Sequence, residues 1–270
     1  WEPYENSIIE DVIKRTNALF NTEITKANCW TQKRADGDSS QKRPKSLDPN
    51  CGFRCLTVSE FGVDYKVELG KNYDCGLYTD MAQVRSDLKK DFENSDCVLN
   101  LYSYTGAFSL FALKHGSTDV VSVDLSEPYL DTLEENIKNN ELNSEFHQAM
   151  LMSCKEALSE LISKKREFDL IISDPPSSSS DGNKRTNALK DYEYELPKIA
   201  KLLSKEGKAC VFLNTRGVTR NKFEKKILEI IQRSGLKLKI EKKLGLSGDC
   251  PNLKGFPEGA YLKGLVLSRD

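Results

Sequence analysis

The sequence predicts an α/β fold: a doubly wound, Rossmann-like, mostly parallel sheet that follows a small N-terminal α+β hairpin extension. The first observation is residues 98–124, which have the pattern of a strand, a tight turn, a helix and a second strand ending at Asp124. The second is residues 168–173, a mostly apolar run with the length of a buried strand. The third is the alternation of strand and helix patterns along the chain, which parallel strands require because a crossover connects each pair.

Length and composition allow one large domain with an appendage, because the chain has 270 residues, 38% of them hydrophobic and 30% charged. We expect residues 1–74 to form an extension made of a helix, a polar loop and a hairpin, and residues 75–270 to form the main domain. No apolar run is long enough to cross a bilayer, so we expect no membrane partner. The chain begins at Trp1 rather than Met, which indicates a fragment or a processed chain.

The extension contains three recognisable patterns. Apolar residues at helical spacing predict a helix within residues 3–20. Residues 31–50 combine Lys, Arg, Asp, Ser and Pro with few apolar anchors and predict a polar loop. Residues 56–60 and 63–69 alternate around a Gly turn and predict a β-hairpin.

The main domain should begin with a helix capped by Thr79 or Asp80 and running to about Phe92. Pro128 near a first turn marks the start of another helix, and Pro197 predicts a kink in a later one. Beyond residue 124 the predicted elements are a helix from Ser126 through Ile137, a strand from Phe146, a helix over 154–165, a strand over 168–173, a loop over 177–187, a helix over 188–204, a strand over 208–213, a helix over 222–234 and strands over 236–243 and 260–268.

Charge and cysteine content narrow the class of protein. The net charge of −1 neither requires nor excludes a nucleic-acid partner, but residues 201–243 hold 13 Lys and Arg against 4 Asp and Glu. Such a stretch is either a solvated surface or a surface suited to phosphates. Of the eight cysteines only Cys51 and Cys55 are close together, and the chain has two His, so we expect no metal site. Cys97 and Cys210 fit buried free thiols, which indicates a reducing, cytoplasmic location.

The turn over residues 102–108 is the first candidate site. It joins a strand to a helix, and Asp124 follows Gly106 by 18 residues at the end of the next strand. Backbone N–H groups at such a helix N-terminus, together with a strand-end carboxylate that accepts from ribose hydroxyls, would hold an adenosine-type cofactor. The alternative is an ordinary strand–turn–helix, because the turn lacks the G-x-G-x-x-G fingerprint.

Two further strand ends should lie at the same edge of the sheet, where ligands of open parallel sheets bind. Asp174-Pro175-Pro176 ends one strand, and its carboxylate and free carbonyls could accept from a planar amine or orient a base. Asn214-Thr215-Arg216-Gly217 ends the next, and Arg216 could bind a phosphate or stack on a base. A Pro-rich strand exit and a solvated surface turn are the alternatives.

At these residues the chain resembles the class I S-adenosylmethionine-dependent methyltransferases, and more closely the bacterial family that methylates large-subunit ribosomal RNA on cytosine C5 or guanine N7. The most specific matches are Ser-Tyr-Thr-Gly at 103–106, Asp-Pro-Pro at 174–176 and Pro-Glu-Gly-Ala-Tyr-Leu-Lys-Gly at 257–264. Residues 75–80 with Arg85, and 123–126, match as well. The resemblance spans residues 56–270 and implies that the 102–108 turn holds the methionine part of the cofactor, Asp124 the ribose, and Asp174-Pro175 the neighbourhood of the methyl group and its target.

The chain departs from that family in three places. Ser153 stands where many members have an Asp that accepts from the adenine amine. Asn214-Thr215-Arg216 stands where the cytosine-C5 members have a nucleophilic Cys, and Cys210 lies inside the preceding strand pattern. Cytosine C5 is a poor nucleophile until a thiolate adds at C6, so its methylation is disfavoured here unless another Cys substitutes. The N-terminal RNA-binding module of many members is absent from this chain.

The hypothesis is therefore an S-adenosylmethionine-dependent methyltransferase that acts in ribosomal RNA processing by direct transfer to a ring nitrogen, with guanine N7 favoured. RNA is the expected partner, and a monomer or a homodimer both stay open. The competing hypotheses are a cytosine-C5 enzyme, a protein or small-molecule methyltransferase, and a degenerate binding protein of this fold. The expected catalytic residues are Asp174, Pro175 and Asn214, and the expected cofactor-binding residues are Asp80, Tyr102, Ser103, Tyr104, Thr105, Gly106, Asp124, Leu125, Ser153 and Asp174.

Overall fold

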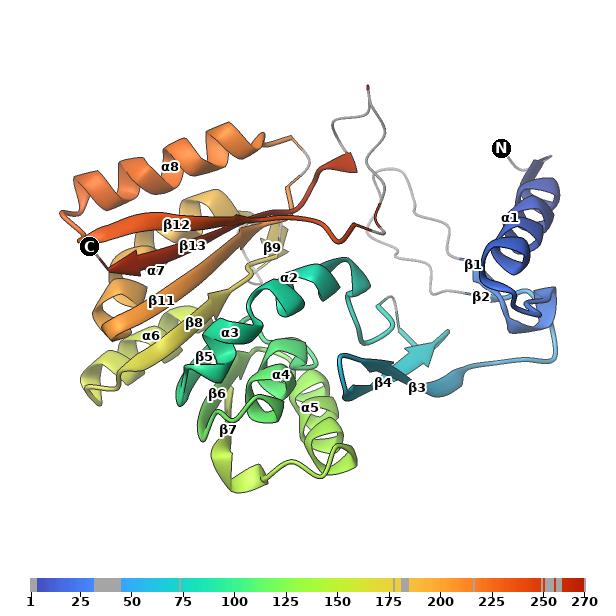
Figure 1. Cartoon of the computed structure of the whole chain (residues 1–270), viewed down its shortest axis with the longest axis horizontal. Coiled ribbons are helices and arrows are strands. Elements are labelled where there is room, and N and C mark those ends of the chain that lie inside the picture. The colour runs from blue at the N-terminus through green and yellow to red at the C-terminus, as the bar shows by residue number, and fades with distance from the viewer. Residues whose placement is uncertain are drawn as a thin grey trace. The chain divides into compact units, whose positions relative to one another are not determined.

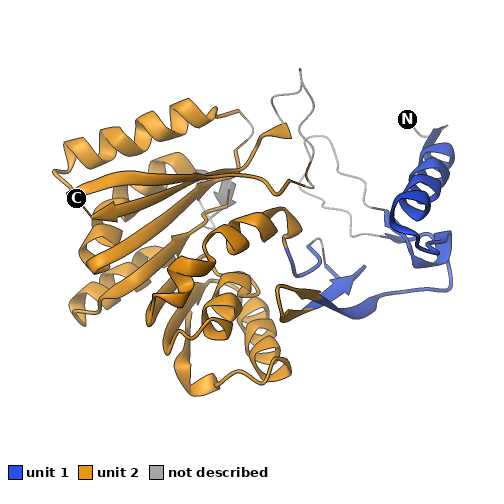
Figure 2. Ribbon diagram, viewed as in Figure 1, with its two compact units in different colours: residues 1–58, 66–77 blue, residues 59–65, 78–270 orange. Residues whose placement is uncertain are grey.

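The computed structural model describes residues 4–31, 45–72, 74–176, 178–180, 185–215, 217–248, 250, 255 and 259–269. The chain divides into two compact units, coloured separately in Figure 2. The first unit contains residues 1–58 and 66–77, and the second contains residues 59–65 and 78–270. The predicted boundary between residues 74 and 75 stays a prediction.

Residues 4–69 contain the expected helix and hairpin, and residues 59–65 of the hairpin belong to the second unit. No residue of the helix α1 is buried. The hairpin turns at Phe61 and Gly62, whose φ angles of 51° and 78° are both left-handed, as in the two-residue turns that suit the twist of paired strands. The ends of the expected polar loop pair as two short strands, and residues 32–44 lie outside the described residues. The elements are α1 (Glu5–Phe20), η2 (Lys26–Asn28), β1 (Trp30–Thr31), β2 (Lys45–Ser46), β3 (Arg54–Glu60) and β4 (Val63–Leu69).

The second unit is built on a seven-stranded sheet with the order β12-β13-β11-β8-β5-β6-β7 (Figure 1). Neighbouring strands from β11 to β7 are parallel, and β13 is antiparallel to both of its neighbours. The predicted mostly parallel, doubly wound sheet is thereby confirmed. Its strands are β5 (Cys97–Leu101), β6 (Asp119–Asp124), β7 (His147–Leu151), β8 (Phe168–Ser173), β11 (Leu203–Leu213), β12 (Leu238–Leu244) and β13 (Lys263–Arg269).

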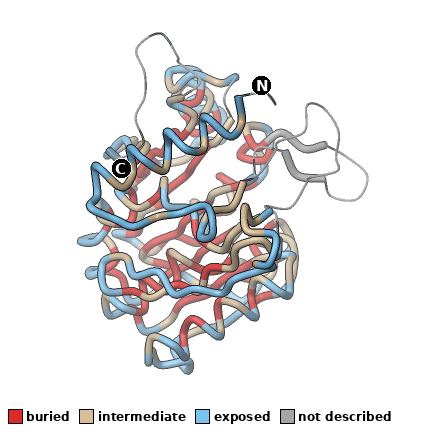
Figure 3. The backbone as a smooth tube through the Cα atoms, turned by 90° about the vertical axis from the view of Figure 1, so that its right-hand side faces the viewer, coloured by how far each residue is buried: buried red, intermediate tan, exposed pale blue. Residues whose placement is uncertain are grey.

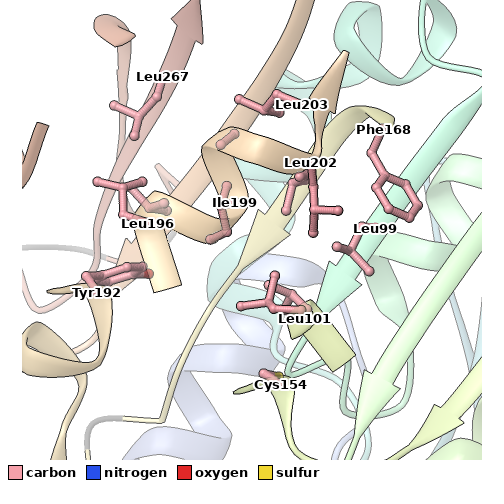
Figure 4. Close-up of a cluster of buried hydrophobic side chains, with 14 of the residues drawn as sticks. Leu99, Leu101, Cys154, Phe168, Tyr192, Leu196, Ile199, Leu202, Leu203 and Leu267 are labelled. Carbon is pink, nitrogen blue, oxygen red and sulfur yellow. The ribbon is translucent and has the colours of Figure 1, made fainter. Parts of the chain in front are cut away.

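Helices lie on both faces of this sheet (Figure 1). Alternate strand residues such as Leu99 and Leu101 share one buried cluster with apolar residues of α6, α7 and α8 (Figure 4). Helices α4 and α5 contact strands β5 and β6 as well as each other. Buried residues are concentrated along the strands, and the outer sides of the helices are exposed (Figure 3). The helices are η3 (Thr79–Met81), α2 (Ala82–Asp87), α3 (Lys89–Glu93), α4 (Ala107–Lys114), α5 (Glu127–Asn139), η4 (Ser144–Phe146), α6 (Cys154–Ser163), α7 (Ala188–Leu202) and α8 (Arg220–Arg233).

Several predicted elements were wrong in detail: the helix expected over 188–204 ends at Leu202, and the strand expected over 260–268 begins at Lys263. The single helix expected up to Phe92 is divided into η3, α2 and α3. Strand β11 begins at Leu203 rather than 208, because Leu203 pairs with Phe168 before an irregularity shifts the register at Lys208. The loop expected over 177–187 contains two short paired strands, β9 (Ser178–Ser180) and β10 (Arg185–Asn187).

The tip of the hairpin belongs to the second unit and is held there by buried polar contacts. Arg85 is buried and forms a bidentate ion pair with Glu60, with Nε 2.6 Å from Oε1 and Nη2 3.0 Å from Oε2. Asn140 Oδ1 accepts from the N–H of Asp64 at 2.7 Å, and Asn140 Nδ2 donates to the carbonyl of Asp64 at the same distance. These contacts fix residues 59–65 against α2 and the end of α5, where a buried charge is tolerable because it is paired.

A chain of polar side chains crosses the layer between the sheet and helices α4 and α5. Asn100 Nδ2 donates to Ser109 Oγ at 2.8 Å, Ser109 Oγ lies 2.7 Å from Ser122 Oγ, and Ser122 Oγ lies 2.8 Å from His147 Nε2. The other ring nitrogen of His147, Nδ1, lies 2.8 Å from Glu134 Oε1. The amide NH₂ of Asn100 can only donate, so Ser109 accepts from it and donates to Ser122, and Ser122 donates to His147 Nε2. His147 must therefore accept at Nε2 and donate at Nδ1.

We predict that the polar network from Asn100 to Glu134 makes the protein less stable in acid. Burial lowers the pKa of His147, although the charge of Glu134 opposes the shift. The unfolded state therefore binds more protons below about pH 6.5, and the free energy of unfolding should fall as the pH drops through that value. Replacing His147 with Phe should remove this dependence and lower the free energy of unfolding at pH 8 by about 1–3 kcal/mol, because the Ser122 hydroxyl loses its acceptor.

Urea denaturation of the wild type and of His147→Phe between pH 5.5 and 8 checks this prediction. Burial also lowers the pKa of His115, so His115→Gln is the matched control and should keep most of the acid sensitivity. An unchanged pH dependence in His147→Phe would contradict the assignment.

Candidate active site

The turn between β5 and α4 has a strained backbone. Tyr102, Tyr104 and Gly106 have φ angles of 57°, 51° and 78°. All three lie in the left-handed region, which is unfavourable for residues with a Cβ atom. The N–H of Ser103 donates to the carbonyl of Val123 at 2.9 Å, which joins the turn to the end of β6. A Cβ atom at position 106 would lie 2.2 Å from Leu133 Cδ1 on α5, so both the conformation and the close approach require Gly.

Asp124, at the end of β6, organises this turn through both of its carboxylate oxygens. Oδ2 accepts from the N–H of Tyr104 at 2.9 Å, and Oδ1 accepts from the N–H of Ser126 at 2.9 Å. Each carboxylate oxygen can accept more than one hydrogen bond, so these contacts leave capacity for a ligand hydroxyl. The structure thus brings the predicted turn and the predicted carboxylate together.

One polar group of the turn lacks a partner. The hydroxyl of Ser103 is buried and makes no hydrogen bond to any described residue. Leaving a buried hydroxyl unpaired costs roughly 1–3 kcal/mol, so this group needs an explanation, and a ligand that binds at the turn would supply its partner. The left-handed turn, the strand-end carboxylate and this hydroxyl fit the polar end and the ribose of an adenosine-type cofactor.

The predicted adenine end of the site is more apolar than the rest. Leu125, directly after Asp124, is 64% exposed, and Leu151, at the end of β7, is 51% exposed. Ser153 caps helix α6: its Oγ accepts from the N–H of Glu156 at 3.3 Å and donates to Glu156 Oε2 at 2.6 Å. These hydrogen bonds lower the pKa of Glu156. Ser153 therefore uses its hydroxyl for the helix, and Glu156 supplies a carboxylate at this end.

The ends of β8 and β11 carry the second part of the site. Asp174 is half-buried, and its Oδ1 accepts from Asn214 Nδ2 at 3.2 Å. Burial raises the pKa of Asp174 to about 7, the negative charge of Asp80 adds to the rise, and the Asn214 amide opposes it. Pro175 is buried, and Pro176 is exposed. A carboxyl group that ionises near neutral pH is typical of a group with a chemical task.

Asp80 is held near Asp174 by residues from the C-terminal part of the sequence. Tyr261 donates its hydroxyl to Asp80 Oδ2 at 2.6 Å. Ser247 Oγ donates to the Asp80 carbonyl at 3.0 Å and accepts from the N–H of Gln83 at 2.9 Å. Sequence reasoning placed Asp80 on the cofactor side, and the structure places its charge close enough to act on Asp174.

A buried cation and a buried hydroxyl support the strand ends. Lys263 is buried in β13, and its Nζ donates to the carbonyls of Thr215 and Val218 at 2.6 and 2.9 Å. Burial lowers the pKa of Lys263 to about 8, and the charge of Arg220 adds to this. The Tyr192 hydroxyl donates to one of the carbonyls of Ser173 and Phe212, which lie 2.9 and 2.8 Å away, and it bridges β8 and β11. The backbone that carries Asp174 and Asn214 is thereby fixed.

The structure thus gathers the predicted residues into two groups at one edge of the sheet. The turn over 102–106, Asp124 and Leu125 form the first group, and Asp174, Pro175, Asn214 and Asp80 form the second. Arg216 and residues 256–258 lie outside the described residues. Sequence reasoning missed Ser247, Tyr261 and Glu156 as parts of the site. The spacing of Ser153 and Glu156, which is that of a capping box, was the one local signal available.

All eight cysteines lie within the described residues and are thiols rather than disulfides. Cys210 is buried in β11 as predicted, and burial raises the pKa of its thiol, whereas Cys97 is half-buried rather than buried. Among the described residues no group of three or more His, Cys, Asp or Glu side chains is arranged to hold a metal ion. No described helix has both the length and the apolar character needed to span a membrane.

Comparison with known proteins gives consistent matches. The chain is 32% identical over 216 residues to ribosomal RNA large subunit methyltransferase I of Pseudoalteromonas translucida, covering 78% of this chain and 53% of that protein. It is 30% identical over 212 residues to the protein of that name from Aeromonas salmonicida, with 78% and 53% covered. The chain therefore spans about half the length of these curated relatives.

Solved structures agree on the fold. A candidate methyltransferase complexed with SAH has a TM-score of 0.74 and 26% identity, with 79% of this chain and 56% of that one covered. A SAM-dependent methyltransferase from Agrobacterium tumefaciens has a TM-score of 0.67 at 17% identity, with 84% and 73% covered. The sheet is thus the Rossmann-like sheet of methyltransferases. The family model for S-adenosylmethionine-dependent methyltransferases matches residues 16–265, so the chain belongs to that family.

Proposed function

We propose that this chain transfers a methyl group from S-adenosylmethionine to a base of RNA, with large-subunit ribosomal RNA as the substrate and guanine N7 as the favoured target. The observation that carries the proposal is the pairing of Asp174 with Asn214 at the same sheet edge as the 102–106 turn and Asp124. The names of the relatives in Pseudoalteromonas and Aeromonas support the substrate class. The cytoplasmic location stays a prediction.

Each proposed cofactor residue would contact a different part of S-adenosylmethionine. Ser103, with its unpaired hydroxyl, and the N–H groups of the 102–106 turn would hold the methionine part. Asp124 would accept from the ribose, and Leu125 would cover one face of the adenine. Glu156 would take the role assigned from sequence to Ser153, because its carboxylate can accept from the adenine amine. When bound, the cofactor supplies an electrophilic methyl group on a sulfonium.

The proposed target residues hold and orient the base. The Asp174 carboxylate and the Pro175 carbonyl can accept from ring or exocyclic N–H groups, and Asn214 holds the carboxylate in place. In the transfer, the lone pair of guanine N7 forms the new bond to the methyl carbon, and the carbon–sulfur bond breaks with its electrons left on sulfur. No proton is lost, and the product guanine is a cation that a nearby carboxylate stabilises.

The composition of the site favours ring nitrogen over cytosine C5. Cytosine C5 needs a thiolate that adds at C6, and Asn214 occupies the position of that Cys. Cys210 is buried inside β11, and burial raises the pKa of its thiol, which disfavours the nucleophilic form. Cys250 is the described cysteine on the β12–β13 connection that also carries Ser247, so it is the substitute to test.

Two competing functions can be tested separately. A methyltransferase acting on protein or a small molecule would show no steep salt dependence of RNA binding, whereas an RNA enzyme should. A degenerate binding protein of this fold would bind the cofactor and transfer nothing. Calorimetry with S-adenosylmethionine at millimolar concentration, RNA binding at several salt concentrations and a transfer assay therefore distinguish both from an RNA methyltransferase.

We predict that incubation with labelled S-adenosylmethionine and unmodified large-subunit ribosomal RNA gives 7-methylguanosine, identified by nucleoside mass spectrometry. Cys250→Ser and Cys210→Ser should keep this product and its rate within about threefold, because direct transfer needs no thiol. A 5-methylcytidine product that disappears in Cys250→Ser would overturn the ring-nitrogen assignment.

We predict that Asp174→Asn lowers the single-turnover transfer rate about 10²-fold and leaves cofactor affinity within about threefold, because the amide cannot stabilise the developing cation. Because the pKa of Asp174 is about 7, the wild-type rate at saturating cofactor should rise between pH 6 and 8 as the carboxylate forms. The rate of Asp174→Asn should not change over this range.

The matched control is Asp119→Asn at the opposite, amino end of β6, where the carboxylate pairs with Arg166 at 2.7 Å. This variant should keep the wild-type rate and pH profile. Equal losses in Asp119→Asn and Asp174→Asn would show that charge removal acts through stability rather than at the site.

A further inference from the structure

A second carboxyl group is buried beneath the cofactor turn and has no role in the proposed transfer. Glu195 lies on α7 with 0% of its surface exposed. The Tyr102 hydroxyl donates to Glu195 Oε1 across 93 residues of sequence. A buried carboxyl with few partners is costly to the fold, so a position of this kind calls for an explanation.

Tyr102 is the residue through which this carboxyl can act. It follows the last residue of β5 and opens the turn with a left-handed φ of 57°. A non-glycine residue in this region persists only where its surroundings impose it. The Tyr102 hydroxyl joins the first residue of the turn to α7 through Glu195, whereas the N–H of Ser103 joins the next residue to the end of β6.

We propose that Glu195 is a positioning residue for the cofactor: by holding the Tyr102 hydroxyl it keeps the 102–106 turn in its binding conformation. The inference rests on the proposed cofactor role of that turn. Its consequence is that cofactor affinity, more than the rate of transfer, depends on Glu195.

Titration of Glu195 gives this idea a separate readout. Burial raises the pKa of Glu195 to about 7; the Tyr102 hydroxyl and Lys155 oppose the rise, and the charge of Asp191 adds to it. A carboxylate accepts a stronger hydrogen bond than a neutral carboxylic acid, so the hold on Tyr102 should weaken as the pH falls through 7. The titratable and charged groups around Glu195 are Tyr102 after β5, Cys154 and Lys155 on α6, and Asp191 and Tyr192 on α7.

Calorimetry with S-adenosylmethionine and SAH tests the proposal on the full chain. At pH 8, Tyr102→Phe should weaken binding about tenfold, the size expected for loss of one hydrogen bond to a charged group. Glu195→Gln keeps an acceptor and should bind within about threefold of the wild type. The double variant Tyr102→Phe/Glu195→Gln should bind no more weakly than Tyr102→Phe, because without the Tyr102 hydroxyl the residue at 195 has no hydrogen bond to the turn left to alter.

The pH dependence separates Glu195 from Asp174, whose pKa is also about 7. In an Asp174→Asn background, affinity should fall severalfold from pH 8 to pH 6. Adding Glu195→Gln should remove that fall. The matched control is Glu193→Gln on the same helix, whose carboxylate pairs with Lys226 and which should keep the fall.

Two results would overturn the inference. The first is wild-type affinity in Tyr102→Phe, with or without a lower melting temperature, because the contact would then serve stability alone. The second is a fall in affinity from pH 8 to pH 6 that survives in the Asp174→Asn/Glu195→Gln double variant. If the unchanged chain binds neither S-adenosylmethionine nor SAH at millimolar concentration, the proposed cofactor site itself is wrong, and this inference is wrong with it.

Discussion

The two carboxylate oxygens of Asp124 make the contacts on which the proposed cofactor side of the site depends. One oxygen accepts from Tyr104 in the turn before α4, and the other accepts from Ser126 at the start of α5. This bridge orients both helices at the carboxyl edge of the sheet, and it brings Leu133 of α5 against Gly106. These contacts hold the left-handed residues of the turn in place, which would preorganise the proposed site for its ligand.

Buried polar groups serve a related purpose elsewhere in the domain. Arg85 pairs with Glu60, Lys263 donates to the carbonyls of Thr215 and Val218, and the polar side chains from Asn100 to Glu134 pair with one another. In each case the partners come from different secondary-structure elements or their ends. Such networks add little stability compared with apolar packing of the same volume, because burying each group has a cost. They specify one arrangement, since any shift of an element would leave a buried group unpaired.

The strand and helix pattern could be predicted from the sequence because periodicity is local. Residues 98–124 and 168–173 formed the expected elements at the expected ends. The division of the helix before Phe92 and the early start of β11 at Leu203 could not be predicted from the sequence, because they depend on the neighbours that each segment contacts. Propensity sets a preference, and tertiary contacts overrule it at such boundaries.

Part of the candidate site could likewise be predicted from the sequence, and part of it could not. Asp124, Asp174 and Asn214 follow strands, so topology alone placed them at one edge. The contacts of Tyr261 with Asp80 and of Tyr102 with Glu195 join residues 181 and 93 positions apart, and no sequence spacing predicts them. The spacing of Ser153 and Glu156, three residues apart, predicts the capping role of Ser153. The family resemblance indicates only that an Asp is missing at this position.

The chemistry of the target side follows from what the strand ends supply. A carboxylate, an amide and proline carbonyls can orient a base and stabilise a developing cation, and none of them can add to a ring carbon. A nitrogen lone pair needs only alignment with the carbon–sulfur bond, because it is already nucleophilic. Asp174, with a pKa of about 7, is ionised in part of the molecules at neutral pH, and in the proposed transfer the ionised form is the one that would stabilise the methylated, cationic base.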